Sequence, residues 1–207
     1  MQQGSEEWFQ ARIGKVTGSR VADVLARTKT GFGASRGNYM AELICERLTG
    51  MQAERYTNAA MQWGAETEPQ ARASYEIVSG VTVEECGLFI HSHIADFGAS
   101  PDGLIGEDGL VEIKCPNTAT HIESLLSRKV DGKYDIQMQA QMACTGRKWC
   151  DFVSFDPRMP VDMQLFVTRI HRDDVFIATM ESEIVAFLAE MKSKIEALNT
   201  QYASKAA

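Results

Sequence analysis

Long apolar runs, paired cysteines and an excess of basic charge are all missing from this sequence of 207 residues. No apolar stretch approaches the roughly 18 residues that cross a bilayer, and the acidic, polar N-terminus is unlike a signal peptide. We therefore expect neither a membrane span nor export. The five cysteines are odd in number and widely scattered, with no C-x-x-C or H-x-x-x-H spacing. This argues against a zinc site and favours reduced cytosolic thiols.

Charge is distributed unevenly along the chain, although the net charge of −7 at first argues against a nucleic-acid partner. Residues 11–55 carry eight Lys and Arg against four Asp and Glu, whereas residues 56–113 carry one against ten. A basic segment beside a carboxylate-rich one is the pattern of a phosphate-binding surface next to a cation site. Ordinary solvated charged faces are the alternative that composition leaves open.

The hydrophobic content of 44%, without repeats or a low-complexity linker, predicts one domain over residues 1–207 with a substantial core. Capping residues and apolar spacing predict helices that begin at Ser5 and after Thr17 and that span 35–49, 58–78, 118–127, 134–144 and 173–198. Alternating runs predict strands over 81–91, up to Asp102, and over 110–115, 149–156 and 163–170. This order predicts a mixed α/β fold in which helices flank a central mixed β-sheet.

Residues 99–116, ASPDGLIGEDGLVEIKCP, carry the clearest chemical signal. The period of two in a strand puts Glu112 and Lys114 on the same face, and the glycine-rich stretch before them can return the chain antiparallel. Asp102 can then lie beside Glu112. Two carboxylates and an ammonium at a sheet end suit metal-assisted hydrolysis of a phosphodiester. An ordinary hairpin with a solvated Glu-x-Lys face is the alternative that spacing alone leaves open.

The order P-D then E-I-K matches the PD-(D/E)xK nuclease motif, which is weakly specific by itself. Five blocks, one of which contains this motif, follow one another in a more specific order: EEWFQARIGKVTGS, MQWGAETEPQAR, SPDG with EIKCP, YDIQMQ and FDPRM. With these blocks, which run from Glu6 to Met159, the sequence resembles the lambda-type phage exonucleases, the YqaJ viral recombinase family of the PD-(D/E)xK superfamily. The resemblance implies a restriction-endonuclease-like core.

The resemblance also implies a site that holds two Mg²⁺ ions, with Mn²⁺ as a substitute. Asp102 would bridge the ions, and Glu112 and the main-chain carbonyl of Ile113 would be further ligands. Lys114 would orient or activate the attacking water and stabilise negative charge in the transition state.

Further candidate residues of the site lie on predicted helices. Glu68, in the pattern WG-x-x-x-E, would complete the second metal site. Glu66 competes for that role, but the two side chains point about 200° apart on a helix, so only one can face the site. Gln137 and Gln139 match a QxQ element, in which Gln137 is a catalytic-site candidate. For Gln139 a DNA contact and an ordinary place on an amphipathic helix are both open.

The N-terminal blocks imply recognition of a DNA 5′ end. Arg12 and Ser19 match positions that bind a 5′-phosphate, which suits a bidentate guanidinium and a hydroxyl at a helix start. Met61 matches an apolar wedge between the last paired bases, with core packing as its alternative. Lys29 is expected to reach the downstream duplex.

Taken together, the resemblance implies a Mg²⁺-dependent 5′→3′ exonuclease that digests one strand of linear double-stranded DNA to 5′-mononucleotides and leaves a 3′ overhang. It further implies a homotrimeric ring, a single-strand annealing protein as recombination partner, and a cytoplasmic location for a phage or prophage protein in its bacterial host. The alternatives are a site-specific endonuclease with the same metal site and a non-catalytic DNA-end-binding subunit.

Overall fold

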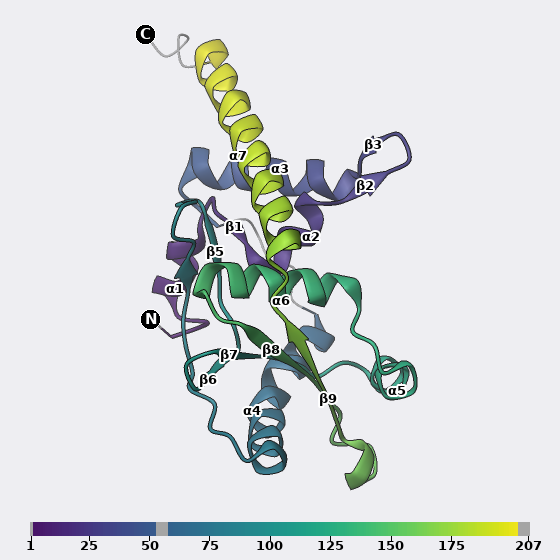
Figure 1. Cartoon of the computed structure of the whole chain (residues 1–207). Coiled ribbons are helices and arrows are strands. Elements are labelled where there is room, and N and C mark those ends of the chain that lie inside the picture. The colour runs from purple at the N-terminus through teal and green to yellow at the C-terminus, as the bar shows by residue number, and fades with distance from the viewer. Residues whose placement is uncertain (1, 53–57, 203–207) are drawn as a thin grey trace.

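A four-stranded mixed sheet lies at the centre of the computed structural model, which describes residues 2–52 and 58–202 (Figure 1). Its strands follow the order β6-β7-β8-β9, in which β7 and β8 are parallel and the outer pairs are antiparallel. They are β6 Gly103–Ile105, β7 Gly109–Lys114, β8 Trp149–Phe155 and β9 Leu165–His171. The predicted mixed α/β class is therefore confirmed.

Two smaller sheets complete the strands of the described residues. One has the order β1-β5-β4 and is formed by β1 Val16–Thr17, β5 Phe97–Ala99 and β4 Phe89–Ile90. The other is the antiparallel hairpin of β2 Arg27–Thr28 and β3 Gly31–Phe32, which projects from the body as an arm (Figure 1).

Most of the helices begin and end where local capping chemistry predicts. Ser5 caps α1 by accepting a hydrogen bond from the Trp8 amide, and Asn58 and Asn117 cap α4 and α5 in the same way. Gly50 ends α3 in the left-handed conformation, at φ 68°, that glycine adopts without a steric cost. The α-helices are α1 Glu6–Arg12, α2 Val21–Val24, α3 Ala34–Thr49, α4 Ala59–Ser79, α5 Thr118–Ser127, α6 Gly132–Thr145 and α7 Asp174–Tyr202, with 3₁₀ turns η1 Gly18–Arg20 and η2 Val161–Met163.

Helices cover both faces of the central sheet, and alternate residues of β7 divide between two hydrophobic cores. Leu110 joins the larger core, which includes residues of α2, α3, α6 and α7. Val111 and Ile113 join the smaller core, in which Ala71 and Tyr75 of α4 pack against the other face. Glu112, by the same alternation, points to the α6 face.

The strand predictions differ from the structure in two places. The run 81–91 forms only the short strand β4 and a single bridge between Glu84 and Leu104. Strand β6 and the hairpin of β2 and β3 were not predicted, because strands of two or three residues are too short to show an alternation of apolar and polar residues. Helix α4 runs through Pro69, in agreement with the single helix predicted over 58–78.

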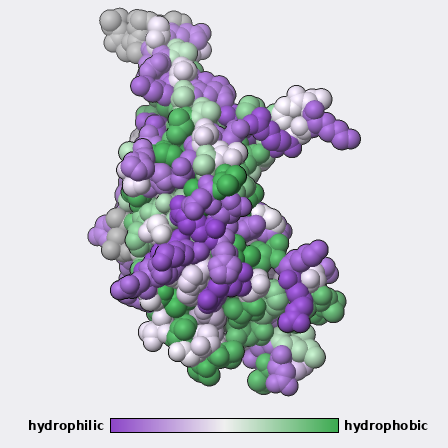
Figure 2. Space-filling model, viewed as in Figure 1, coloured by the Kyte–Doolittle hydropathy of each residue, from purple (hydrophilic) through white to green (hydrophobic). Residues whose placement is uncertain are grey.

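Apolar side chains gather on the surface at one end of the molecule, where Figure 2 is green and Figure 1 places α4, α5 and the β8–β9 connection. Exposed large apolar residues in these elements are Ile77, Val78, Ile122, Leu126, Val161 and Met163. We call this set the apolar end. In the part of the chain that the structure describes, no helix is long and apolar enough to cross a membrane.

Candidate active site

Glu112 is the buried centre of the site and has hydrogen bonds to both carboxylate oxygens. It lies in the middle of β7 with no exposed surface. Its Oε1 accepts a hydrogen bond from Gln137 Nε2 at 2.6 Å and contacts Lys114 Nζ, while its Oε2 accepts one from Gln141 Nε2 at 2.5 Å. These donors satisfy a charge that would otherwise be costly to bury. The shared face predicted for Glu112 and Lys114 is thus observed.

Asp102 reaches the site because β6 pairs antiparallel with β7. The register sets Gly103 opposite Val111, so Asp102 lies beside Glu112 at the sheet end, and its Oδ2 accepts the Ile113 amide at 2.7 Å. Burial, reinforced by the negative charges of Glu112 and Glu68, raises the pKa of Asp102 well above its usual range. The carboxylates therefore repel one another when no metal ion lies between them.

Lys114 is the cation within this group. Burial disfavours its ammonium form, but the charges of Glu112 and Asp102 outweigh that effect and raise the pKa of Lys114 above its ordinary value. A lysine held charged next to two carboxylates can stabilise negative charge that develops on a bound phosphate.

The structure places Glu68, and not Glu66, at the site. Glu68 and Asp102 line one cavity of about 620 Å³ between α4 and the start of β6. Arg72 Nη2 donates to Glu68 Oε1 at 2.9 Å, whereas Glu66 is exposed and accepts from Gln62 at 2.9 Å. The helical argument that only one of the two glutamates faces the site therefore favours Glu68.

The donor set fits a hard divalent cation. Within residues 2–52 and 58–202, no three histidine, cysteine or acidic side chains already converge on one metal position. However, Asp102, Glu112 and Glu68 offer the carboxylate oxygens that Mg²⁺ and Mn²⁺ prefer, and the Ile113 carbonyl is adjacent. A bound cation would also offset the repulsion that raises the pKa of Asp102.

A second cavity, of about 370 Å³, brings together the residues expected to bind a DNA end. Arg12, Ser19 and Met61 line it together with Lys15 and Arg20. Arg12 lies 3.9 Å over the Trp8 ring, and its Nη1 is 3.5 Å from Ser100 Oγ. Met61 is exposed here and not packed in the core. Lys29 lies elsewhere, exposed between β2 and β3 at the tip of the arm.

Gln139 is a site candidate whose side chain is bonded elsewhere in the fold. Its side chain is buried, donates to the His171 carbonyl at 2.8 Å and accepts from the Asp173 amide at 2.9 Å. These bonds tie α6 to the β9–α7 junction, so the placement argues against a DNA contact for Gln139. Gln141, which sequence analysis missed, supplies the second amide at Glu112. Its i, i+4 spacing from Gln137 was the signal that could have found it.

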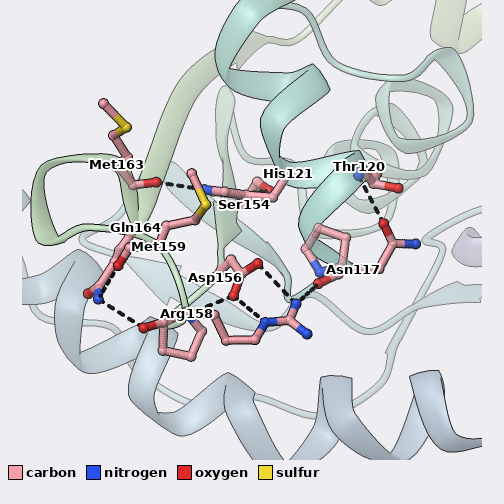
Figure 3. A network of polar contacts seen from close by, with 11 residues as sticks. Asn117, Thr120, His121, Ser154, Asp156, Arg158, Met159, Met163 and Gln164 are labelled. Carbon is pink, nitrogen blue, oxygen red and sulfur yellow. Dashed lines mark hydrogen bonds and ion pairs between the residues drawn. The ribbon is translucent and has the colours of Figure 1, made fainter.

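The FDPRM block forms a supporting network beside the end of β7 (Figure 3). Arg158 makes two hydrogen bonds to the buried Asp156 carboxylate, at 2.7 and 2.9 Å, and one to the Pro116 carbonyl at 3.2 Å. Its guanidinium also lies 4.6 Å over the Trp63 ring of α4. Arg158 therefore joins the ends of β7 and β8 to the helix that carries Glu68.

His121 belongs to the same network and has a structural role. Its Nδ1 lies 2.8 Å from Ser154 Oγ, and its Nε2 lies 2.8 Å from the Met163 carbonyl oxygen (Figure 3). Because a carbonyl accepts the Nε2 proton and the side chain has no exposed surface, this Ser–His pair is satisfied internally and is no exposed nucleophile.

Replacing Asp156 with asparagine is expected to lower the melting temperature by a few degrees at neutral pH. Burial opposes ionisation of Asp156, but hydrogen bonds from Arg158 and Thr118 outweigh it and lower the pKa to about 2. A depressed carboxylate pKa stabilises the fold above its ordinary value near 4 and loses that effect as the pH falls towards 2. Thermal unfolding across pH 2–7 should show the two proteins converging at the acid end. A constant difference at all pH values would contradict this role.

The central sheet and its grouped carboxylates and lysine define a nuclease with a PD-(D/E)xK-type core. A model of the YqaJ-like viral recombinase domain matches residues 7–148. The chain belongs to the YqaJ-like viral recombinase family.

Solved structures agree with that membership. An alkaline exonuclease from Laribacter hongkongensis, LHK-Exo, is 61% identical, and the alignment covers 98% of this chain and 100% of that one with a TM-score of 0.91. LHK-Exo in complex with dAMP matches at the same identity and coverage with a TM-score of 0.92. A phage related exonuclease from Haemophilus somnus, 18% identical over 89% of this chain and 96% of that one, shares the fold with a TM-score of 0.74. No curated protein sequence matches significantly.

Proposed function

We propose that this nuclease is a Mg²⁺-dependent 5′→3′ exonuclease that digests one strand of linear double-stranded DNA to 5′-mononucleotides and leaves a 3′ overhang. The observation that carries the proposal is the pairing of two sites. A carboxylate and lysine group suited to phosphodiester hydrolysis lies in the same chain as a cavity lined by Arg12, Lys15 and Arg20. The 61% identity to an alkaline exonuclease over nearly the whole chain supports it.

Asp102, Glu112, Glu68 and the Ile113 carbonyl would hold the cation. When bound, Mg²⁺ would neutralise charge on the scissile phosphate and polarise it towards attack. Lys114 orients the attacking water and stabilises the charge that builds up on the phosphate oxygens. The water oxygen bonds to phosphorus, and the bond to the 3′ oxygen of the terminal nucleotide breaks. That oxygen takes up a proton as the mononucleotide leaves.

In this proposal, the cavity that Arg12 and Ser19 line sets the direction of digestion. Breaking the bond to the 3′ oxygen leaves a new 5′-phosphate on the shortened strand, so each cycle regenerates the group that Arg12 and Ser19 would bind. The exposed Met61 at this cavity is suited to separating the terminal bases. Lys29, on the projecting arm, would contact the downstream duplex.

We also propose assembly into a homotrimeric ring that passes its DNA to a single-strand annealing protein in the bacterial cytoplasm. An acidic protein of net charge −7 repels DNA in bulk, so sustained digestion favours a closed channel lined by its basic segments. The apolar end is an exposed patch of the kind that mediates contacts between proteins.

Digestion of a linear duplex labelled at one 5′ end tests the activity. With Mg²⁺ we expect progressive release of 5′-mononucleotides and a remaining complementary strand, and no product with a chelator. Ca²⁺ should support little turnover, because its looser coordination positions water and phosphate poorly. A covalently closed circular duplex should remain intact. Discrete fragments would indicate an endonuclease instead, and retained binding without product would indicate a DNA-end-binding subunit.

Native mass tests the ring separately from the chemistry. Light scattering of the pure protein should give three times the chain mass of 22.9 kDa. A monomeric mass, with release from DNA after every few nucleotides when a trap duplex is added, would overturn the ring and leave the nuclease in place.

A further inference from the structure

Gln141 contacts the catalytic carboxylate from a position with no solvent access. It lies on α6, one helical turn after Gln137, so both side chains face β7. Its Nε2 donates to Glu112 Oε2 at 2.5 Å, and its side chain has no exposed surface. The Gln141 amide is therefore shielded from solvent.

The two oxygens of Glu112 have different partners. Gln137 and Lys114 both contact Oε1. Among the hydrogen bonds of the described residues, the donor to Oε2 is Gln141. Without Gln141, the Glu112 carboxylate would keep only its contacts at Oε1 and could rotate about its terminal C–C bond. A neutral amide fixes that rotation without adding positive charge that competes with a cation.

Cys150 lies beside the oxygen end of the Gln141 amide. Its Sγ, buried on β8, lies 3.9 Å from Gln141 Oε1 and at the same distance from the Asp151 carbonyl oxygen. Burial raises the pKa of the Cys150 thiol well above its ordinary value, so the sulfur carries a proton that it can donate. The Glu112 carboxylate accepts only from the NH₂ end of the amide, and a thiol donor at the oxygen end stabilises the same orientation.

We propose that Gln141, oriented by Cys150, is a positioning residue that holds the Glu112 carboxylate in the one rotation that receives the catalytic cation. The proposal rests on the metal-dependent function above. It assigns to α6 a role beyond that of Gln137. Gln137 and Lys114 hold Oε1 of Glu112, and Gln141 holds Oε2.

The test compares Gln141→Met, which keeps the size of the side chain and removes its donor, with the wild-type protein. Mn²⁺ binding is measured by calorimetry without DNA, and kcat and KM for duplex DNA are measured at saturating Mg²⁺. We expect roughly tenfold weaker Mn²⁺ binding and a kcat lowered about tenfold, with KM for DNA unchanged, because outer-shell substitutions typically cost about 10–100-fold. Unchanged Mn²⁺ affinity and kcat in folded Gln141→Met would overturn the proposal.

Gln164→Met is the matched control for a general loss of stability. Gln164 donates to the Pro157 and Met159 carbonyls at 3.0 Å each, in the network of Figure 3. This variant should lower the melting temperature and leave Mn²⁺ affinity at the wild-type value. If it weakened Mn²⁺ binding as much as Gln141→Met did, the effect would be one of stability and the positioning role would be wrong.

Two Cys150 variants keep the test decisive if Gln141→Met does not fold. Cys150→Ser retains a donor and should bind Mn²⁺ like the wild type, whereas Cys150→Ala should bind it more weakly. Equal affinities in the two variants would overturn the role of Cys150. Wild-type protein that neither binds Mn²⁺ nor hydrolyses DNA would refute the proposed function itself, whereas an active wild type matched by Gln141→Met would refute only the positioning role.

Discussion

Asp102→Asn, Glu112→Gln and Lys114→Met are each expected to reduce DNA hydrolysis by roughly a thousandfold or more, because groups that act together on one phosphate lose most of their effect when one is removed. The fold should survive each change. Asparagine and glutamine keep the shape of the acids and remove one of the mutually repelling negative charges, whereas Lys114→Met removes the cation beside them and should lower the melting temperature. Initial rates on a labelled linear duplex, with thermal unfolding as the check on folding, measure the effect.

The double variant Asp102→Asn/Glu112→Gln sharpens this result. If the two carboxylates act as a unit, it should be no slower than the slower single variant. Fully multiplicative losses would show that they act independently. Near-wild-type rates with Mg²⁺ in either single carboxylate variant would show that the site assignment is wrong.

Arg12→Ala is expected to slow digestion of a 5′-phosphorylated duplex about ten- to a hundredfold, the value of a charge-assisted contact of roughly 1.5–3 kcal/mol. A 5′-hydroxyl duplex should be affected far less, because it offers no terminal phosphate for the guanidinium to bind. Rates on the two substrates, measured side by side, give the ratio directly.

Two further variants interpret the Arg12 result. Arg12→Lys keeps the charge but loses the planar group that lies over Trp8, and it should fall between wild type and alanine. Ser19→Ala should act in the same direction but more weakly, since it removes a neutral donor. Equal losses on phosphorylated and hydroxyl duplexes would instead assign Arg12 to packing against Trp8 and Ser100.

The sequence by itself determined the local features of the active site. A strand of period two places Glu112 and Lys114 on one face, and that contact is present. Capping residues also mark helix ends: Ser5 and Asn117 begin helices, and Gly50 ends one. Each of these ends depends on only a few neighbouring residues. Helical geometry also showed that only one of Glu66 and Glu68 can face the site, and the structure then placed Glu68 there. In each case the deciding interaction lies within one strand, one turn or one cap.

Only the tertiary structure decided which groups from distant segments meet. The burial of Glu112, the pairing of Gln141 and Cys150 behind it, and the use of Gln139 at the β9–α7 junction all depend on how α6 crosses the sheet. Sequence spacing gives the direction of a side chain around its own helix, but it does not give the partner that another element brings to it. A buried carboxylate takes whatever donors packing places within about 3 Å, so its partners are fixed only when the helix and the sheet are packed together.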